Sequence, residues 1–215
     1  MKKRDTAKSL ETRMRILETA ERLFGEIGVP ATTQRKVAEV AGIRVSNVYY
    51  YFSSKQDLHR AIILERIKNV MARQDELLEL ARERAPGGKL SCEAIVHAYA
   101  APRLFEIKDS SSRHLLSALF SYVITGEEAD VKEYRELGLR QDQKFLALLC
   151  EAMPDFTELE LKVRLTLLNA ALCGLVGIAR HVSDDFPKDV PADDYKKMIM
   201  AYFTAAFVAP QNFKK

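Results

Sequence analysis

A stretch near the start of the chain, residues 32–55 (TTQRKVAEVAGIRVSNVYYYFSSK), has the pattern of two short helices joined by a tight turn. The first helix has an apolar side around Val37, and Thr32 or Thr33 is placed to cap its free N–H groups. Gly42 can end this helix because glycine adopts the left-handed conformation without a Cβ clash. The stretch predicts a helix-turn-helix, whose second helix lies in the major groove of DNA.

The second helix of this pattern is expected to turn a polar side outward. Ile43 and Val48 are the apolar positions that would anchor it, so the side chains around them are left to project into solvent. Arginine can bond twice with a guanine edge and asparagine twice with an adenine edge, each pair giving about 1–3 kcal/mol of discrimination. Asn47 is therefore expected to read a base, whereas Arg44 is equally suited to a base or a phosphate.

Other residues around the turn are expected to contact the DNA backbone. Gln34 and Arg35 start the first helix, where free N–H groups and the helix dipole attract a phosphate. Three consecutive tyrosines at 49–51 cannot all be buried on a helix, and Lys55 stands beside the start of the next helix. The predicted DNA contacts are Thr33, Gln34, Arg35, Arg44, Val45, Ser46, Asn47, Tyr49, Tyr50, Tyr51 and Lys55.

The longer run ILETAERLFGEIGVPATTQRKVAEVAGIRVSNVYYYFSSKQDL resembles the DNA-binding domain of the tetracycline-repressor (TetR) family. The residues that carry the resemblance, in this order and spacing, are Leu23-Phe24, Gly28, Thr32-Thr33, Val37-Ala38, Ala41-Gly42, Tyr49, Phe52, Lys55 and Leu58. The resemblance covers roughly residues 10–60. It implies DNA-backbone roles for Thr33, Tyr49, Tyr51 and Lys55, a dimer made by the last two helices, and release of DNA by a small molecule.

The charge distribution fits a DNA-binding first part. The formal net charge is only +3, but residues 1–60 hold 12 Lys and Arg against 7 Asp and Glu, whereas the remainder holds 21 against 23. A basic head on a slightly acidic body indicates phosphate binding by the head. Residues 1–9 carry four basic side chains and are either a DNA-contacting arm or a frayed terminus.

The remaining chain predicts an all-α protein of about nine helices, because glycine and proline are sparse and few segments alternate as strands do. After the three helices of the head, helices are expected at about 54–83, 90–107, 113–124, 128–152, 157–182 and 191–208. The first of these links the head to the body. The expected domains are a DNA-binding domain, residues 1–53, and an effector-binding and dimerisation domain, residues 54–215.

The last two helices are expected to form a homodimer interface. Leucines in 157–182 recur at alternating spacings of four and three, which is a heptad seam, and the final helix has a similar apolar side. Both helices could instead fill the core of the body, but proteins with one short recognition helix normally act as two-fold dimers. The predicted interface residues are Leu161, Leu165, Leu168, Leu172, Leu175, Tyr195, Ile199, Tyr202 and Phe203.

The body mixes aromatic and polar residues into apolar helices. Candidates for lining an effector cavity, each of which could instead be ordinary core, are His97, Tyr99, Arg103, Phe105, His114, Phe120, Tyr122, Tyr134, Phe145 and Asn169. As the resemblance implies, a small molecule bound there would release a homodimeric repressor from a palindromic operator, and the lack of a charge cluster favours an apolar or aromatic effector. The alternative is a regulator of the same fold controlled by a protein partner, with no small-molecule pocket.

Several other functions are disfavoured by the sequence. The three cysteines form neither a C-x-x-C pair nor a disulfide framework, which indicates a reducing compartment. No signal peptide begins the chain, and its longest uncharged run is shorter than a membrane span. The histidines lack metal-ligand spacing, and no nucleophile–base pair or phosphate loop is apparent. We therefore expect a cytoplasmic, soluble protein that is not an enzyme and needs no metal or cofactor.

Overall fold

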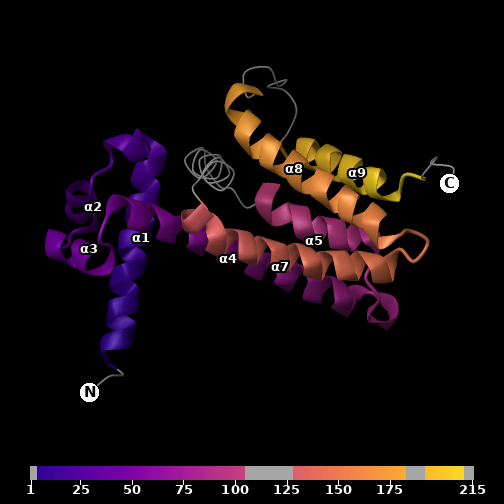
Figure 1. The fold of residues 1–215 in the computed structure, drawn as a ribbon, viewed down its shortest axis with the longest axis horizontal. Helices are drawn as coiled ribbons and strands as arrows, with labels where there is room; N and C mark the ends of the chain where they lie inside the picture. The colour runs from indigo at the N-terminus through magenta and orange to yellow at the C-terminus, as the bar shows by residue number, and fades with distance from the viewer. Residues whose placement is uncertain (1–3, 105–127, 183–191, 211–215) are drawn as a thin grey trace. The chain divides into compact units, whose positions relative to one another are not determined.

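The computed structural model describes residues 4–104, 128–182 and 192–210 (Figure 1). These residues form helices and the turns between them, without a β-strand, so the predicted all-α class is confirmed. The elements are α1 (Arg4–Ala31), α2 (Gln34–Ala41), α3 (Val45–Tyr51), α4 (Lys55–Arg84), η1 (Pro86–Gly88), α5 (Cys92–Leu104), α7 (Glu128–Ala152), α8 (Glu158–Val182) and α9 (Ala192–Val208). The helix expected at 113–124 lies outside the described residues.

The described residues form two compact units. The first contains residues 4–68, and the second contains residues 69–104, 128–182 and 192–210. Helix α4 contributes to both, since the first unit ends at Lys68, inside this helix. The domain boundary predicted between residues 53 and 54 falls just before this shared helix and stays a prediction.

The first unit is built on the apolar stripe of α1. The buried residues of this stripe recur at helical spacing and are Ile16, Leu17, Ala20, Leu23 and Phe24. Helix α1 packs on α2, and α2 packs on α3. The buried residues that these helices and the start of α4 add are Val37, Ala38, Val48, Phe52, Leu58, Ile62 and Ile63. This small core fixes how α2 and α3 are held.

The link from α1 to α2 shows which threonine caps the second helix. Lys36 donates its backbone N–H to the Oγ1 of Thr33 at 3.1 Å, so Thr33 is the cap. Thr32 is buried instead and donates its hydroxyl to the carbonyl of Gly28 at 2.9 Å. Gly28 interrupts the helical conformation of α1 with a φ of 82°, which only glycine adopts readily.

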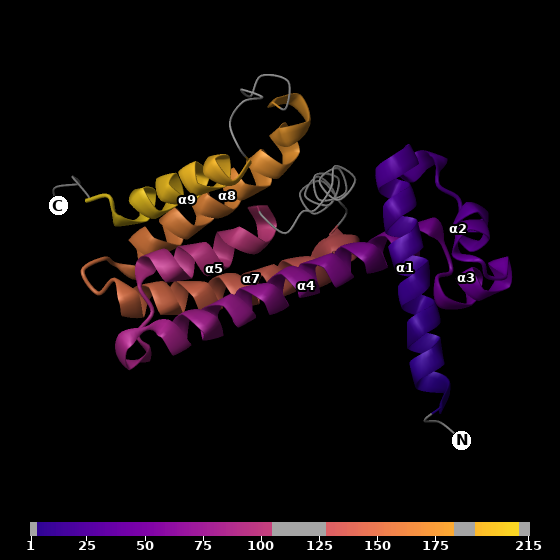
Figure 2. The same ribbon diagram turned by 180° about the vertical axis from the view of Figure 1, so that it is seen from behind.

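In the second unit, α5 lies between α8 and α9 on one side and α4 and α7 on the other (Figures 1 and 2). The helix α5 is buried along most of its length, including Tyr99, which meets Phe145 of α7 edge-on with ring centroids 4.9 Å apart. The other core residues from the surrounding helices include Leu78, Leu149, Met153 and Phe207.

The leucine seam of α8 belongs to this core. Leu161, Leu165, Leu168 and Leu172 are buried within the single chain, as is Phe203 of α9. The structure therefore places these predicted interface residues in the alternative position, the core of the body. The physical reason is that α5, α7 and α9 of the same chain cover the seam, so a partner is not needed to bury it.

The start of α8 and the end of α9 are fixed by specific hydrogen bonds. Thr157 and Glu160 form the predicted capping box, with the Thr157 N–H donating to the Glu160 carboxylate at 2.6 Å. Arg164 of α8 donates to the carbonyl oxygens of Ala206, Phe207 and Ala209 at 2.6–2.8 Å. These carbonyls at the end of α9 would otherwise lack an intrahelical partner. Arg164 thus ties the two helices together.

Candidate DNA-binding site

The turn between α2 and α3 sets the exposed side of α3. Gly42 has a φ of 65°, and the N–H of Ile43 donates back to the carbonyl of Ala38 at 3.0 Å, as at a glycine-ended helix. Helix α3 then begins at Val45 and is anchored by Val48, whose exposed fraction is 0%. The residues that flank Val48 on the helix are left facing solvent.

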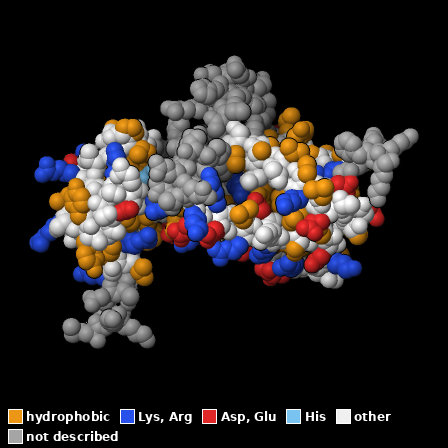
Figure 3. All heavy atoms as spheres, viewed as in Figure 1, with side chains coloured by type: hydrophobic (Ala, Val, Ile, Leu, Met, Phe, Trp, Pro, Cys, Tyr) orange, Lys and Arg blue, Asp and Glu red, His pale blue; other side chains and the backbone are white. Residues whose placement is uncertain are grey.

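Most predicted DNA contacts lie on this exposed surface. The exposed members are Thr33, Arg35, Arg44, Val45, Ser46, Asn47, Tyr49 and Tyr50. Among the described residues, neither Arg35 nor Arg44 has a hydrogen-bond or ion-pair partner for its side chain, so both guanidinium groups are available. Figure 3 shows Lys and Arg side chains projecting outward from the first unit. The arrangement offers base-reading groups at the start of α3 with cationic and phenolic groups around them.

Gln34 does not share this surface. Its exposed fraction is 8%, and its side-chain amide donates to the carbonyl of Phe52 at 2.8 Å. That bond ties the start of α2 to the residue that ends α3. The structure thus replaces the predicted phosphate contact of the Gln34 side chain with an internal one. The sequence did not indicate this, because the partner is a backbone atom 18 residues away.

Tyr51 and Lys55 are held by contacts with α1. The hydroxyls of Tyr51 and Ser9 are 3.0 Å apart, and the Tyr51 ring is half-buried. The Lys55 ammonium donates to the carbonyls of Val29 and Pro30 at 3.1 and 3.2 Å. An ammonium group has three N–H donors, so these two bonds leave one for a phosphate. Tyr51 and Lys55 therefore have structural contacts within the unit, and their predicted contact with DNA stays a prediction.

Two residues beside this surface were not predicted from the sequence. Ser9 meets Tyr51, and Arg13 lies over the Phe52 ring with its guanidinium carbon 5.6 Å from the centroid. They stand four apart on α1 and therefore on one face of it. Both positions continue the apolar stripe of α1 toward its start, seven residues before Ile16 and Ala20, and polar residues at stripe positions were the signal that could have identified them.

The first half of α4 is joined to α1 by a charged and an aromatic contact. Arg66 is hydrogen-bonded to and ion-paired with Glu21. The rings of Phe24 and His59 meet edge-on with centroids 5.4 Å apart. Burial of His59, with the charge of Lys55 nearby, lowers the pKa of its imidazole. Within this unit, α4 and the helix-turn-helix therefore share the scaffold of α1.

Six polar residues from four helices of the second unit form a connected group, here called the polar cluster: Gln74, Tyr99, Arg103, Gln141, Asp142 and Asn169. Gln74 is fully buried and donates to the backbone carbonyl of Tyr99 at 2.8 Å. Its side-chain oxygen accepts from Gln141 at 3.1 Å. These two bonds join α4, α5 and α7.

The other half of the polar cluster surrounds the Tyr99 ring. The phenol donates to Asp142 at 2.7 Å, and the Arg103 guanidinium carbon lies 4.5 Å from the ring centroid. Arg103 also donates to the side-chain oxygen of Asn169 at 2.8 Å. Burial raises the pKa of the Tyr99 phenol, so the neutral, donating form faces Asp142.

The structure brings together only part of the predicted effector set. Arg103, Asn169 and Tyr99 meet in the polar cluster, Tyr134 and Phe145 are buried on α7, and His97 is exposed on α5. The predicted residues outside the described part of the chain are Phe105, His114, Phe120 and Tyr122. The sequence pattern missed Gln74, Gln141 and Asp142 because isolated polar residues on helices usually face solvent.

The described residues contain neither a candidate membrane span nor a candidate metal site. None of the helices there combines the length and the apolar character needed to cross a membrane. No three His, Cys, Asp or Glu side chains of that part of the chain gather where they could hold a metal ion.

The α2–turn–α3 geometry, with its exposed basic and polar face, defines a helix-turn-helix protein. A family model described as "Bacterial regulatory proteins, tetR family" matches residues 16–62. The HTH-type transcriptional regulator TtgW of Pseudomonas putida is 34% identical over 98 residues, which cover 46% of this chain and 67% of that protein. The chain belongs to the TetR family of bacterial regulatory proteins.

Other similar proteins are regulators as well. The HTH-type transcriptional repressor KstR2 of Mycobacterium tuberculosis (strain ATCC 25618 / H37Rv) is 30% identical over 112 residues, covering 50% of this chain and 55% of that protein. The crystal structure of FadR from Bacillus subtilis in complex with stearoyl-CoA aligns with a TM-score of 0.65 at 14% identity, over 90% of this chain and 98% of that one, which shows the fold alone. The chain spans 30–55% of the length of the first curated relatives that it matches. The family consists of transcriptional regulators, so the prediction that the chain is not an enzyme is confirmed.

Proposed function

We propose that this chain is a homodimeric repressor that binds a palindromic operator and leaves it when a small molecule binds the second unit. The observation that carries the DNA-binding part is the contrast along α3. Val48 is fully buried, whereas Arg44, Val45, Ser46 and Asn47 at the start of the helix are exposed. Residues at the start of a recognition helix are those that reach base edges in the major groove.

The exposed groups divide into two kinds of contact. Asn47 supplies an amide that matches an adenine edge, and Arg44 supplies a guanidinium that matches a guanine edge or a phosphate. Arg35, Tyr49 and Lys55 surround them with donors suited to phosphate oxygens. The first kind sets which sequence is bound, and the second sets how tightly any DNA is held.

Exposed apolar residues on α8 and α9 support a dimer. Leu159, Val163 and Leu167 stand four residues apart on one side of α8 and are all exposed. Met198 and Tyr202 stand four apart on α9 and are exposed too. Hydrophobic side chains also gather over these two helices in Figure 3. A surface of this kind is typical of an interface with another chain.

This dimer surface replaces most of the one predicted from the sequence. Of the predicted residues, Tyr202 faces outward and Ile199 is half-buried, while the leucine seam and Phe203 are core. The side chains of Leu175 and Tyr195 lie outside the part of the chain that the structure describes. We assign the interface to the opposite side of α8, which carries Leu167.

The polar cluster supports a role for the second unit in sensing. It links α5, α7 and α8 to α4, the helix that also belongs to the DNA-binding unit. A ligand could replace the hydrogen bond between Arg103 and Asn169 with bonds to its own polar groups. Such a ligand would favour one arrangement of these helices over another. The fold of FadR, solved with stearoyl-CoA, is compatible with a small-molecule effector. Such a regulator would act in the cytoplasm, where the chromosome lies.

Selection of bound duplexes from random-sequence DNA tests the proposal. We expect a two-fold symmetric site whose half-sites are separated by about 10 bp or a multiple of it. Asn47→Ala should relax the preference at one base pair of each half-site by about 1–3 kcal/mol. Arg35→Ala should weaken binding to all sequences alike. Selection of no preferred sequence by the wild-type chain would contradict the proposal.

A further inference from the structure

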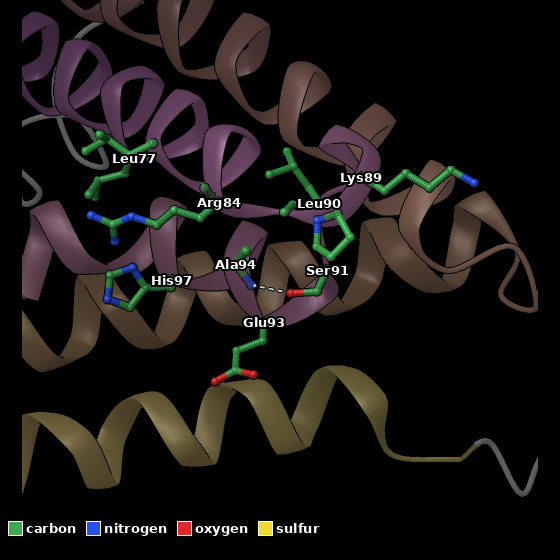
Figure 4. A pocket seen from close by; sticks show the side chains of 12 residues that line it. Leu77, Arg84, Lys89, Leu90, Ser91, Glu93, Ala94 and His97 are labelled. Carbon is green, nitrogen blue, oxygen red and sulfur yellow. Dashed lines mark hydrogen bonds between the residues drawn. The ribbon is translucent and has the colours of Figure 1, made fainter.

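A groove lies where the end of α4 turns into the start of α5 (Figure 4). The chain reverses here through η1, and Gly87 and Gly88 permit the tight turn because both have positive φ, 65° and 70°. The groove has a volume of about 510 Å³, which falls in the range of small-molecule sites, about 300–1,000 Å³. It is therefore large enough to hold an organic ligand.

The walls of the groove are mainly apolar. Leu77 and Ala81 contribute from α4, and Leu90 and Ala94 contribute from the turn and α5. All four are partly exposed in the single chain. A hydrocarbon laid against them would remove apolar surface from water, at roughly 25 cal/mol per Å².

Two basic side chains stand at the same edge of these walls. Arg84, from the last turn of α4, and His97, from α5, both line the groove and extend toward the same side of it in Figure 4. The Lys89 and Glu93 side chains extend away from them in that view. Glu93 is the acidic residue of the groove lining, and its carboxylate is directed away from Arg84 and His97 in that view.

Arg84 differs from three other arginines of α4, each of which is paired with a glutamate. Arg66 pairs with Glu21, Arg73 with Glu76 and Arg82 with Glu79. In the described part of the chain, Arg84 and His97 have neither an ion-pair nor a hydrogen-bond partner for their side chains. The groove thus combines an apolar floor with an unneutralised guanidinium and a free imidazole.

We propose that this groove binds a single-chain organic acid, with its carboxylate at Arg84 and His97 and its hydrocarbon against Leu77, Leu90 and Ala94. A guanidinium presents parallel N–H donors that match the two oxygens of a carboxylate. The imidazole adds a donor from a second helix, so the acid would join α4 to α5. A cationic amphiphile would meet Arg84 as a like charge, and a neutral one would leave it without a counter-ion.

The groove is separate from the polar cluster. His97 is on the exposed side of α5, whereas Tyr99 of the cluster is fully buried. Binding at the groove is measured directly on the protein, without DNA. Its failure would therefore leave the repressor proposal untouched.

Isothermal titration calorimetry of the full chain with decanoate tests the proposal. Arg84→Gln should weaken decanoate binding about tenfold or more, which is about 1.4 kcal/mol or above. Arg82→Gln is the matched control, because it makes the same change in the same turn at an arginine already paired with Glu79. It should bind decanoate as the wild type does. Equal affinity in the Arg84→Gln and Arg82→Gln variants would overturn the proposal.

Two further measurements identify the site and the charge requirement. Decanol and decyltrimethylammonium carry the same chain without the carboxylate, and both should bind more weakly than decanoate. In NMR spectra of the imidazole groups, decanoate should shift the signal that disappears in His97→Gln. If decanol bound as tightly as decanoate, or if that signal did not move, the assigned site would be wrong.

Discussion

The Lys55 ammonium donates to the carbonyl oxygen of Val29 at 3.1 Å, joining the first residue of α4 to the last turn of α1. A second bond to Pro30 strengthens the junction. A cation is favoured at the end of a helix, where carbonyl groups lack partners. Lys55 therefore helps to hold the helix-turn-helix in place, in addition to its proposed contact with a phosphate.

Replacing Lys55 with methionine separates these two roles. Lys55→Met should lower the free energy of unfolding by about 1–2 kcal/mol, because two charge-assisted bonds are lost. It should also weaken binding to all DNA sequences and reduce the salt dependence of affinity by about one charge. Urea denaturation and fluorescence anisotropy at several salt concentrations measure the two effects. Lys68→Met, at an exposed position of α4, is the control and should change neither the stability nor the DNA affinity. If the salt dependence of DNA affinity were the same in Lys55→Met as in the wild type, the phosphate contact would be refuted.

Gln34→Ala tests whether that side chain serves the fold or the DNA. Removing the amide leaves the buried carbonyl of Phe52 without its partner, so stability should fall by about 1–3 kcal/mol. DNA affinity, measured at a temperature where the variant is folded, should change little. Gln56→Ala is the control at an exposed position of α4. Intact stability with reduced DNA affinity would instead restore the phosphate contact predicted from the sequence.

Substitutions at two neighbouring leucines of α8 distinguish the proposed dimer interface from the core of the second unit. The exposed fraction of Leu167 is 64% and that of Leu168 is 4%. Leu167→Glu should yield folded monomers in sedimentation velocity, because a charge would be buried at the dimer surface. Leu168→Ala should instead cost about 2–5 kcal/mol of stability. Lys162→Glu, at an exposed position of the same helix, is the control and should remain dimeric. If Leu167→Glu also remained dimeric, the proposed interface would be wrong.

His59 makes the stability of the first unit depend on pH. Burial lowers the pKa of its imidazole below the ordinary value of 6.5, so the unfolded chain binds a proton more readily than the folded one. The stability that this pKa difference contributes is complete above pH 6.5. It is lost as the pH falls through the pKa that His59 has in the folded protein. Denaturation of wild type and His59→Gln between about pH 7.5 and 5 measures this. The wild type should lose more stability than the variant, and parallel curves would contradict the assignment.

The helix-turn-helix was predictable because its determinants are local. Gly42 ends a helix and Val48 anchors the next one within a few residues of each other, and both appear in the structure as the spacing indicated. The capping box of Thr157 and Glu160 was predictable for the same reason. A hydrogen bond or a buried side chain that depends on residues nearby in the chain leaves a recognisable pattern.

The leucine seam of α8 and the polar cluster depend on distant residues. A heptad pattern shows that Leu165 and Leu168 are covered, but not whether a partner or α5 and α7 of the same chain cover them. Likewise, Gln74 and Gln141 lie 67 residues apart, and nothing local marks them as a buried pair. Of the six residues of the polar cluster, Tyr99, Arg103 and Asn169 were predicted as candidates, but their contacts with one another were not.

Arg164 has a consequence for how a second chain would dock. Its guanidinium donates to the carbonyl oxygens of Ala206 and Phe207 at the end of α9 and of Ala209 just beyond it. The guanidinium carbon also lies 4.7 Å from the ring centroid of Phe156. The end of α9 is therefore kept from fraying before any encounter takes place. In the proposed dimer, the second copy would contact Tyr202 on a helix that is already ordered. Association would therefore lose less conformational entropy, and the two copies would adopt a single register.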